Sequence, residues 1–102
     1  TGFHDHDRSS GAVAVVEGTI REERLRIGRD PERHTYKPGS SFSFSASDIH
    51  RVVHAGTEPA ITIHAYSPPL ANMGSYVVED DGALKREPLG AGTELKPLAP
   101  AA

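Results

Sequence analysis

The sequence contains no cysteine among its 102 residues. No disulfide can therefore form within the chain, and a metal site built on thiolates is excluded. The absence of cysteine is compatible with a reducing compartment, and we expect a cytoplasmic protein. The sequence also lacks an initial Met, and residues able to bind a metal begin at position 4. We therefore expect the chain to be the downstream part of a longer protein.

Long apolar runs and clusters of positive charge are also missing. No apolar stretch approaches the ~20 residues needed to span a bilayer, and no signal peptide is visible. The eleven Lys and Arg residues are scattered and the net charge is −3, so nothing favours nucleic-acid binding. With 25% charged and 36% hydrophobic residues, the composition is typical of one soluble globular domain. We expect a monomer without nucleic-acid or membrane partners.

No stretch has helical periodicity, and the apolar pattern predicts strands. Residues 11–17 form a near-continuous apolar run, typical of a strand covered on both faces. Residues 40–46 alternate, with Phe42 and Phe44 on one face, while the polar residues 28–39 predict a loop. Further strands are expected at 19–27, 49–53, 60–65, 74–78 and 83–87, with a hairpin turn at 80–82. The pattern predicts an all-β barrel or sandwich over residues 1–88 and a flexible C-terminal tail over 89–102.

Six histidines are the main candidates for chemistry. His4 and His6 form an H-x-H step, and on a strand both side chains would lie on one face about 7 Å apart. Such a step can bind a metal, but it also describes a solvated polar end of a chain. His50, at the entry to a predicted strand, is the candidate third ligand. His54 is expected at the surface or as a hydrogen-bond donor behind a ligand, and His34 is expected to be exposed.

The spacing around these histidines resembles the cupin motifs. The H-x-H step is followed by Gly11 and by a closing glycine, Gly18, as in the first motif. Residues 45–50, SASDIH, are similar to the second motif, P-x-G-x-x-H, with serine in place of proline and glycine. This resemblance covers residues 2–53. It implies a cupin-type β-barrel (double-stranded β-helix), whose N-terminal strands we expect to precede this chain.

A longer run is similar to the cysteine dioxygenases and other thiol dioxygenases. HRV at 50–52 is followed by EPA at 58–60 and by TIHAYSPP at 62–69, close to the family signature S-x-H-x-Y-S-P-P. The resemblance implies iron(II) bound by three histidines and a hydrogen-bond relay from a second group of residues. The implied ligands are His4, His6 and His50, and the implied catalytic relay is Thr62, His64 and Tyr66. Without the resemblance, Tyr66 would be interpreted as a buried anchor with His64 as its partner.

Gly11 stands at the position where most cupins have a glutamate ligand. The resemblance then leaves three neutral imidazoles, unlike the common site of two histidines and one carboxylate. An ion held this way keeps its positive charge and should attract an anionic thiolate. Animal cysteine dioxygenases have a cysteine at this position, cross-linked to the tyrosine. Because this chain has no cysteine, Tyr66 should be unmodified.

The resemblance implies an iron(II)-dependent dioxygenase that oxidises L-cysteine to cysteine sulfinic acid with O₂. Cysteine-selective members resemble one another in an arginine upstream of this chain, whereas mercaptopropionate-type enzymes have one shortly after the tyrosine. Residues 70–76 contain no arginine, and neither Arg8 nor Arg51 is expected to point inward. Cysteine is therefore favoured over 3-mercaptopropionate or another small thiol. Met73 is expected either to line the pocket or to fill a gap in the core.

Two interpretations from other functional classes remain open. Three histidines with an open position also describe a catalytic zinc site, which would make the protein a zinc-dependent cupin hydrolase. The barrel could alternatively be a non-enzymatic metal-binding cupin. Metal analysis distinguishes iron from zinc, and thiol-dependent oxygen consumption distinguishes an enzyme from a binding protein.

Overall fold

The computed structural model describes residues 2–90, which form antiparallel β-strands as the sequence predicts. The described part contains no helix that is long and apolar enough to cross a membrane. The strands are β1 (His4–Asp5), β2 (Ser10–Glu17), β3 (Ile20–Arg26), β4 (Arg29–Tyr36), β5 (Ser41–Phe44), β6 (His50–His54), β7 (Ile61–Ser67), β8 (Asn72–Val78) and β9 (Leu84–Gly90). The expectation of an all-β, cupin-like fold is confirmed.

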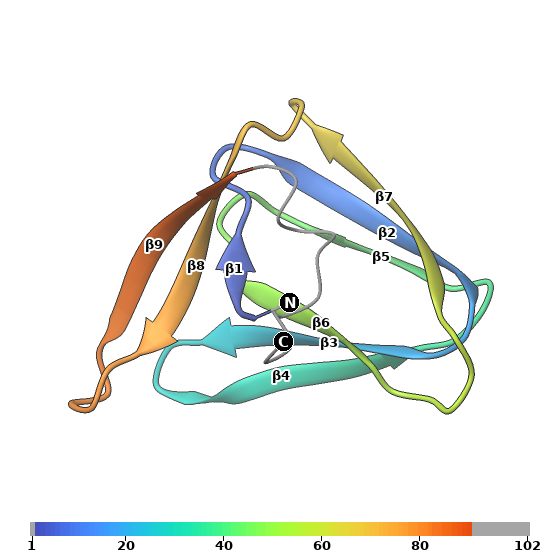
Figure 1. Ribbon diagram of the computed structural model, residues 1–102, viewed down its shortest axis with the longest axis horizontal. Helices are drawn as coiled ribbons and strands as arrows, with labels where there is room; N and C mark the ends of the chain where they lie inside the picture. Colours follow the sequence, from blue (N-terminus) through green and yellow to red (C-terminus); the bar gives the residue numbers. More distant parts are fainter. Residues whose placement is uncertain (1, 91–102) are drawn as a thin grey trace, which may run out of the picture.

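The strands form two sheets that face each other (Figure 1). The larger sheet has the order β4-β3-β6-β1-β8-β9, and the smaller has the order β5-β2-β7. β1 is short, but it pairs with β6 on one side and with β8 on the other. The first strand of the chain therefore connects two halves of the larger sheet that come from the middle and the end of the sequence.

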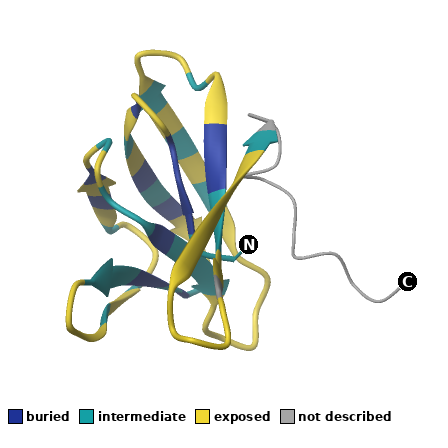
Figure 2. Cartoon of the chain, turned by 90° about the vertical axis from the view of Figure 1, so that its left-hand side faces the viewer, coloured by how far each residue is buried: buried dark blue, intermediate teal, exposed yellow. Residues whose placement is uncertain are grey.

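The apolar core lies between the inner faces of the two sheets. Its buried members are Val13, Val15, Ile20, Phe42 and Phe44. Figure 2 shows bands of buried and exposed residues following one another along the strands of the molecule. β5 follows the predicted alternation, with both phenylalanines buried and both serines exposed. Burying a side chain of this size contributes roughly 1.5–3 kcal/mol, so these residues stabilise the contact between the sheets.

The prediction that residues 11–17 form a strand covered on both faces is wrong. β2 occupies these positions and pairs with β5 and β7, but only one of its faces is buried. Val13 and Val15 point into the core, whereas Val16 is 47% exposed. The run looked continuous because small alanines occupy outward positions between the valines, and alanine is apolar without requiring burial.

The prediction of a loop at residues 28–39 is also wrong over most of its length. β4 covers residues 29–36 and pairs with β3 over a register that runs from Ile20↔Tyr36 to Arg26↔Arg29. β4 is an edge strand with most of its residues exposed or half-buried, so it carries no apolar alternation. Pro31 is tolerated because an edge strand has one side without ladder hydrogen bonds.

The predicted hairpin turn at residues 80–82 is confirmed. The backbone N–H of Glu79 donates to the carbonyl of Ala83, and the turn joins β8 to β9. β9 continues to Gly90, three residues beyond the predicted end, because it pairs with β8 as far as Asn72↔Gly90. The predicted tail thus begins inside a strand. The rest of that tail, residues 91–102, lies outside the described residues.

Candidate metal centre and its surroundings

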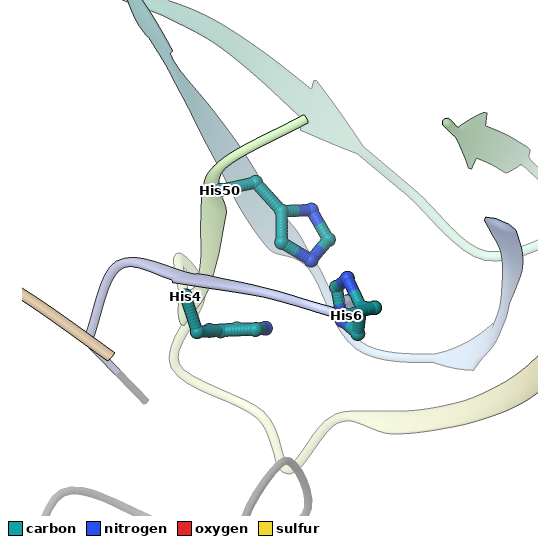
Figure 3. A group of neighbouring side chains, drawn as sticks. All are labelled: His4, His6 and His50. Carbon is teal, nitrogen blue, oxygen red and sulfur yellow. The ribbon is translucent and has the colours of Figure 1, made fainter. Parts of the chain in front are cut away.

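Backbone pairing brings three buried histidines together. His4 in β1 is the direct register partner of His50 in β6, and His6 follows β1 immediately on the same side as His4. The three side chains are at most 2% exposed, and their ring centroids are 4.8–5.0 Å apart. Figure 3 shows the three rings turned toward one another. The structure therefore unites the three residues that the sequence singled out as metal ligands.

One nitrogen from each ring lies within 4.8 Å of the other two. Three atoms at this separation share a point no more than about 2.8 Å from each, and metal–imidazole bonds measure ~2.0–2.2 Å. Small rotations of the rings would therefore close the site around one ion. In the described part of the chain, this is the group of histidine and acidic side chains with metal-binding geometry, and it contains no carboxylate.

Hydrogen bonds orient two of the three rings. His4 Nδ1 donates to the Gly2 carbonyl at 2.7 Å, and His50 Nδ1 donates to Glu22 Oε2 at 2.7 Å. Both partners can only accept, so Nδ1 carries the proton and Nε2 keeps its lone pair for a metal. Burial lowers the pKa of His50, and the hydrogen bond to Glu22 offsets this only in part. Burial thus favours the neutral form of His50, which is the form that binds a metal.

Phe44 forms one wall of the histidine group. Its ring stacks on His6 with centroids 4.4 Å apart and lies equally close to His50. Gly11 sits beneath the ring, and a Cβ at this position would lie 2.2 Å from the Phe44 side chain. Gly11 and Phe44 therefore exclude a carboxylate ligand at residue 11, in line with a donor set of imidazoles alone.

The three candidate relay residues lie along one face of β7. Thr62 Oγ is 2.9 Å from His64 Nε2, and the Tyr66 hydroxyl is 3.4 Å from His64 Nδ1. The ring of Tyr66 is 5.5 Å from that of His6, measured between centroids. The structure thus connects Thr62, His64 and Tyr66 in the predicted order and places the tyrosine end beside a candidate ligand. Beside His6 there is also a small pocket of about 70 Å³, lined in part by Arg8, Pro68, Pro69 and Asn72.

Comparison with known families agrees with this geometry. Residues 1–78 of the 102 match the family described as cysteine dioxygenase type I. The protein belongs to the cysteine dioxygenase type I family. No curated protein sequence matches the chain. Membership confirms the resemblance stated above and indicates a metal-dependent enzyme of the dioxygenase type that acts, in general terms, on thiols.

In this family member, the residue between the first two histidines has its own anchor. The Asp5 carboxylate accepts from Arg86 through two nitrogens, from the Tyr76 hydroxyl at 2.6 Å and from the Gly74 backbone N–H. Burial alone would raise the pKa of Asp5, but the hydrogen bonds from Arg86 and Tyr76 outweigh it and hold that pKa well below its usual range. Asp5 therefore ties β1 to the β8–β9 hairpin as a carboxylate anion.

The remaining histidines stay away from the centre. His34 lies in β4, in the segment predicted as a loop, and is exposed beside Glu32. His54 is the last residue of β6, and its Nε2 is 2.5 Å from the Glu58 carbonyl. It is exposed, as one of the two predicted positions requires. Met73 is buried on β8.

Sequence reasoning missed Glu22, Asp5 and Arg86 as parts of the centre. A signal for Glu22 was present, because it is two residues beyond the buried Ile20 on a strand and must share its inward face. Asp5 could have been recognised as the residue that faces away from both histidines. Arg86 had no such signal, since its partner is 81 positions away and it lies beyond the residues that match the family.

Proposed function

We propose that the protein is an iron(II)-dependent thiol dioxygenase that converts L-cysteine to cysteine sulfinic acid. In this reaction both atoms of O₂ are added to the sulfur of the thiol. The observation that carries the proposal is the convergence of His4, His6 and His50, all buried, in a chain of the cysteine dioxygenase type I family.

The donor set fits ferrous iron. Imidazole nitrogens suit iron as well as zinc, so the ligands alone do not select the metal. Zinc has no redox chemistry, and oxygenation of a thiol requires a metal that can exchange electrons with O₂. When bound, iron would supply this activation of O₂ and thiolate, and the protein would supply placement and electrostatics. The three ligands are neutral and bring no negative charge into direct contact with the ion, which favours binding of an anionic thiolate.

The relay on β7 supports a role for Tyr66 in orienting the substrate or oxygen. With His64 Nε2–H donating to Thr62, His64 Nδ1 can accept from the Tyr66 hydroxyl. This chain of hydrogen bonds restricts the position of the Tyr66 hydroxyl, and the ring of Tyr66 lies beside that of His6. A tyrosine held this way can donate to, or accept from, a group bound next to the histidines.

Arginines available to hold the carboxylate of cysteine are few. Arg51 is committed to Glu23 and lies over the ring of Phe3, and Arg86 is committed to Asp5. Arg8 lines the small pocket beside His6, although the sequence suggested that it points away. β7 and β8 contain no arginine. Mercaptopropionate-type enzymes are expected to have one shortly after the tyrosine, so its absence supports cysteine over 3-mercaptopropionate as the proposed substrate.

Metal analysis combined with oxygen uptake tests this proposal. Protein purified without added metal and then loaded with Fe(II) should consume O₂ only when a thiol is present, with the sulfinic acid as product. Loading with Zn(II) should give no oxygen uptake. Oxygen uptake that does not depend on the thiol, or hydrolytic activity in the zinc form, would contradict the proposal.

A further inference from the structure

Glu22 is a fully buried carboxylate beside the candidate metal centre. It lies on β3, next to β6 in the larger sheet, and has 0% exposure. One oxygen accepts from His50 Nδ1 at 2.7 Å, and the other accepts from Arg24 Nε at 2.8 Å. Burying a charge is costly unless it is paired and hydrogen-bonded. Both oxygens of this carboxylate therefore accept a hydrogen bond, and one of the two donors, His50, is a candidate metal ligand.

We propose that Glu22 is a positioning residue that directs His50 at the metal and supplies the negative charge that the three imidazoles lack. The inference rests on the proposed metal centre at His4, His6 and His50. The carboxylate accepts the Nδ1–H of His50, which leaves the lone pair of Nε2 for the ion. A carboxylate in this position also makes an imidazole a stronger donor.

Comparison of His50 with His4 distinguishes the effect of the Glu22 charge from the effect of orienting the imidazole ring. His4 Nδ1 donates to the Gly2 carbonyl at the same distance, 2.7 Å, but that partner is neutral. Both rings are oriented, whereas only His50 has a carboxylate behind it. The histidine group itself contains no carboxylate. The Glu22 carboxylate therefore stabilises the positive ion electrostatically from behind His50, to which it is hydrogen-bonded.

Arg24 weakens the electrostatic effect of the Glu22 carboxylate on His50 and the ion. Its guanidinium donates to Glu22 and to Asp48 and also contacts the Ser43 carbonyl, so its position is fixed by three partners. It neutralises part of the Glu22 charge from the side opposite His50. Removing Arg24 should therefore act in the opposite direction to removing the charge of Glu22.

Glu23 is the matched control for Glu22. It is the next residue of β3, is 1% exposed, and likewise accepts hydrogen bonds from arginines, Arg21 and Arg51. Successive residues of a strand face opposite sides, so its carboxylate points away from the histidines. Glu23→Gln removes an equally buried charge without touching a candidate ligand.

The test compares Glu22→Gln, Glu23→Gln and Arg24→Gln with the wild type. Apoprotein is titrated with Co(II), whose visible absorption reports the ligands, and the Fe(III)/Fe(II) midpoint potential is measured in the iron-loaded protein. Glu22→Gln should weaken Co(II) binding by about 10–100-fold and raise the potential, because ferric iron loses more stabilisation than ferrous iron. Arg24→Gln should lower the potential, and Glu23→Gln should change neither quantity.

The outcomes separate this inference from the proposed function. If the wild type does not bind Co(II), or if His50→Ala leaves binding intact, the metal centre itself is wrong. If His50→Ala abolishes binding while Glu22→Gln matches the wild type, Glu22 has no such role. Should Glu22→Gln fail to fold, Arg24→Gln decides alone: an unchanged or raised potential would overturn the inference.

Discussion

Asp5 and Arg86 are 81 positions apart in the sequence and form a bidentate ion pair. Arg86 Nε lies 2.9 Å from Asp5 Oδ2, and Arg86 Nη2 lies 3.0 Å from Asp5 Oδ1. Because Asp5 separates the two histidines of the H-x-H step, this pair fixes the backbone that carries them. Gly74 makes the approach possible, since a Cβ there would lie 2.1 Å from Arg86 Nε.

Arg86→Ala should therefore destabilise the fold although Arg86 lies far from the core. A hydrogen bond to a charged group contributes about 1.5–3 kcal/mol, but Arg86 is 41% exposed and water screens the pair. We expect a loss of about 1 kcal/mol in the free energy of unfolding, measured by urea denaturation. Lys85→Ala, one residue away on the other face of β9, is the control and should be neutral. Equal stability of the two variants would refute the anchoring role.

Tyr66→Phe should lower turnover far more than stability. Losing one partly buried hydroxyl costs about 1 kcal/mol in folding, whereas a group aimed at the reacting atoms contributes roughly 10²-fold or more to the rate. Oxygen-uptake kinetics and thermal unfolding should be measured together. Tyr36→Phe is a suitable control, because the ring of Tyr36 stacks on Phe42 and lies near His34, which is not a candidate ligand. Wild-type kinetics in the Tyr66 variant would make that residue structural.

Stability should fall in acid partly because of Glu23. Burial acts to raise its pKa, but hydrogen bonds from Arg51 and Arg21 outweigh burial and lower the pKa below its usual value. A group with a lowered pKa stabilises the fold fully above its unfolded value, about 4.3 for glutamate, and loses that contribution as the pH falls below it.

The free energy of unfolding should be measured across the range from neutral pH down to acid. Glu23→Gln should be less stable than the wild type at pH 7 and should lose less stability between about pH 5 and pH 3. Parallel pH profiles for the two proteins would show that Glu23 does not contribute to acid sensitivity.

L-Cysteine should be oxidised with a higher kcat/KM than 3-mercaptopropionate. A mercaptopropionate-type enzyme is expected to have an arginine shortly after the tyrosine. The segment after Tyr66 has no arginine up to β9, where Arg86 is already paired with Asp5. Steady-state oxygen uptake with both thiols measures the preference. Arg8→Gln is an informative companion, since Arg8 lines the pocket beside His6. A preference for 3-mercaptopropionate would reverse the substrate assignment without affecting the metal centre.

Much of the fold and the centre could be predicted from local pattern. Period-two alternation placed Phe42 and Phe44 on one inward face, and the H-x-H step placed His4 and His6 on one side of a strand. The resemblance of residues 62–69 to the family signature implied the order of the β7 relay, and the structure places these side chains in contact in that order. These features depend on residues close in sequence, so the sequence carries them directly.

Other features follow from strand pairing, which no local pattern reports. β4 is a strand because β3 offers it a partner, although its own residues look like a loop. His50 reaches His4 through the pairing of β1 with β6. Arg86 reaches Asp5 because β8 connects β9 to β1 within one sheet. Residue types and spacing determined which side chains could bind a metal, whereas the order of strands in the larger sheet decided which charges lie behind them.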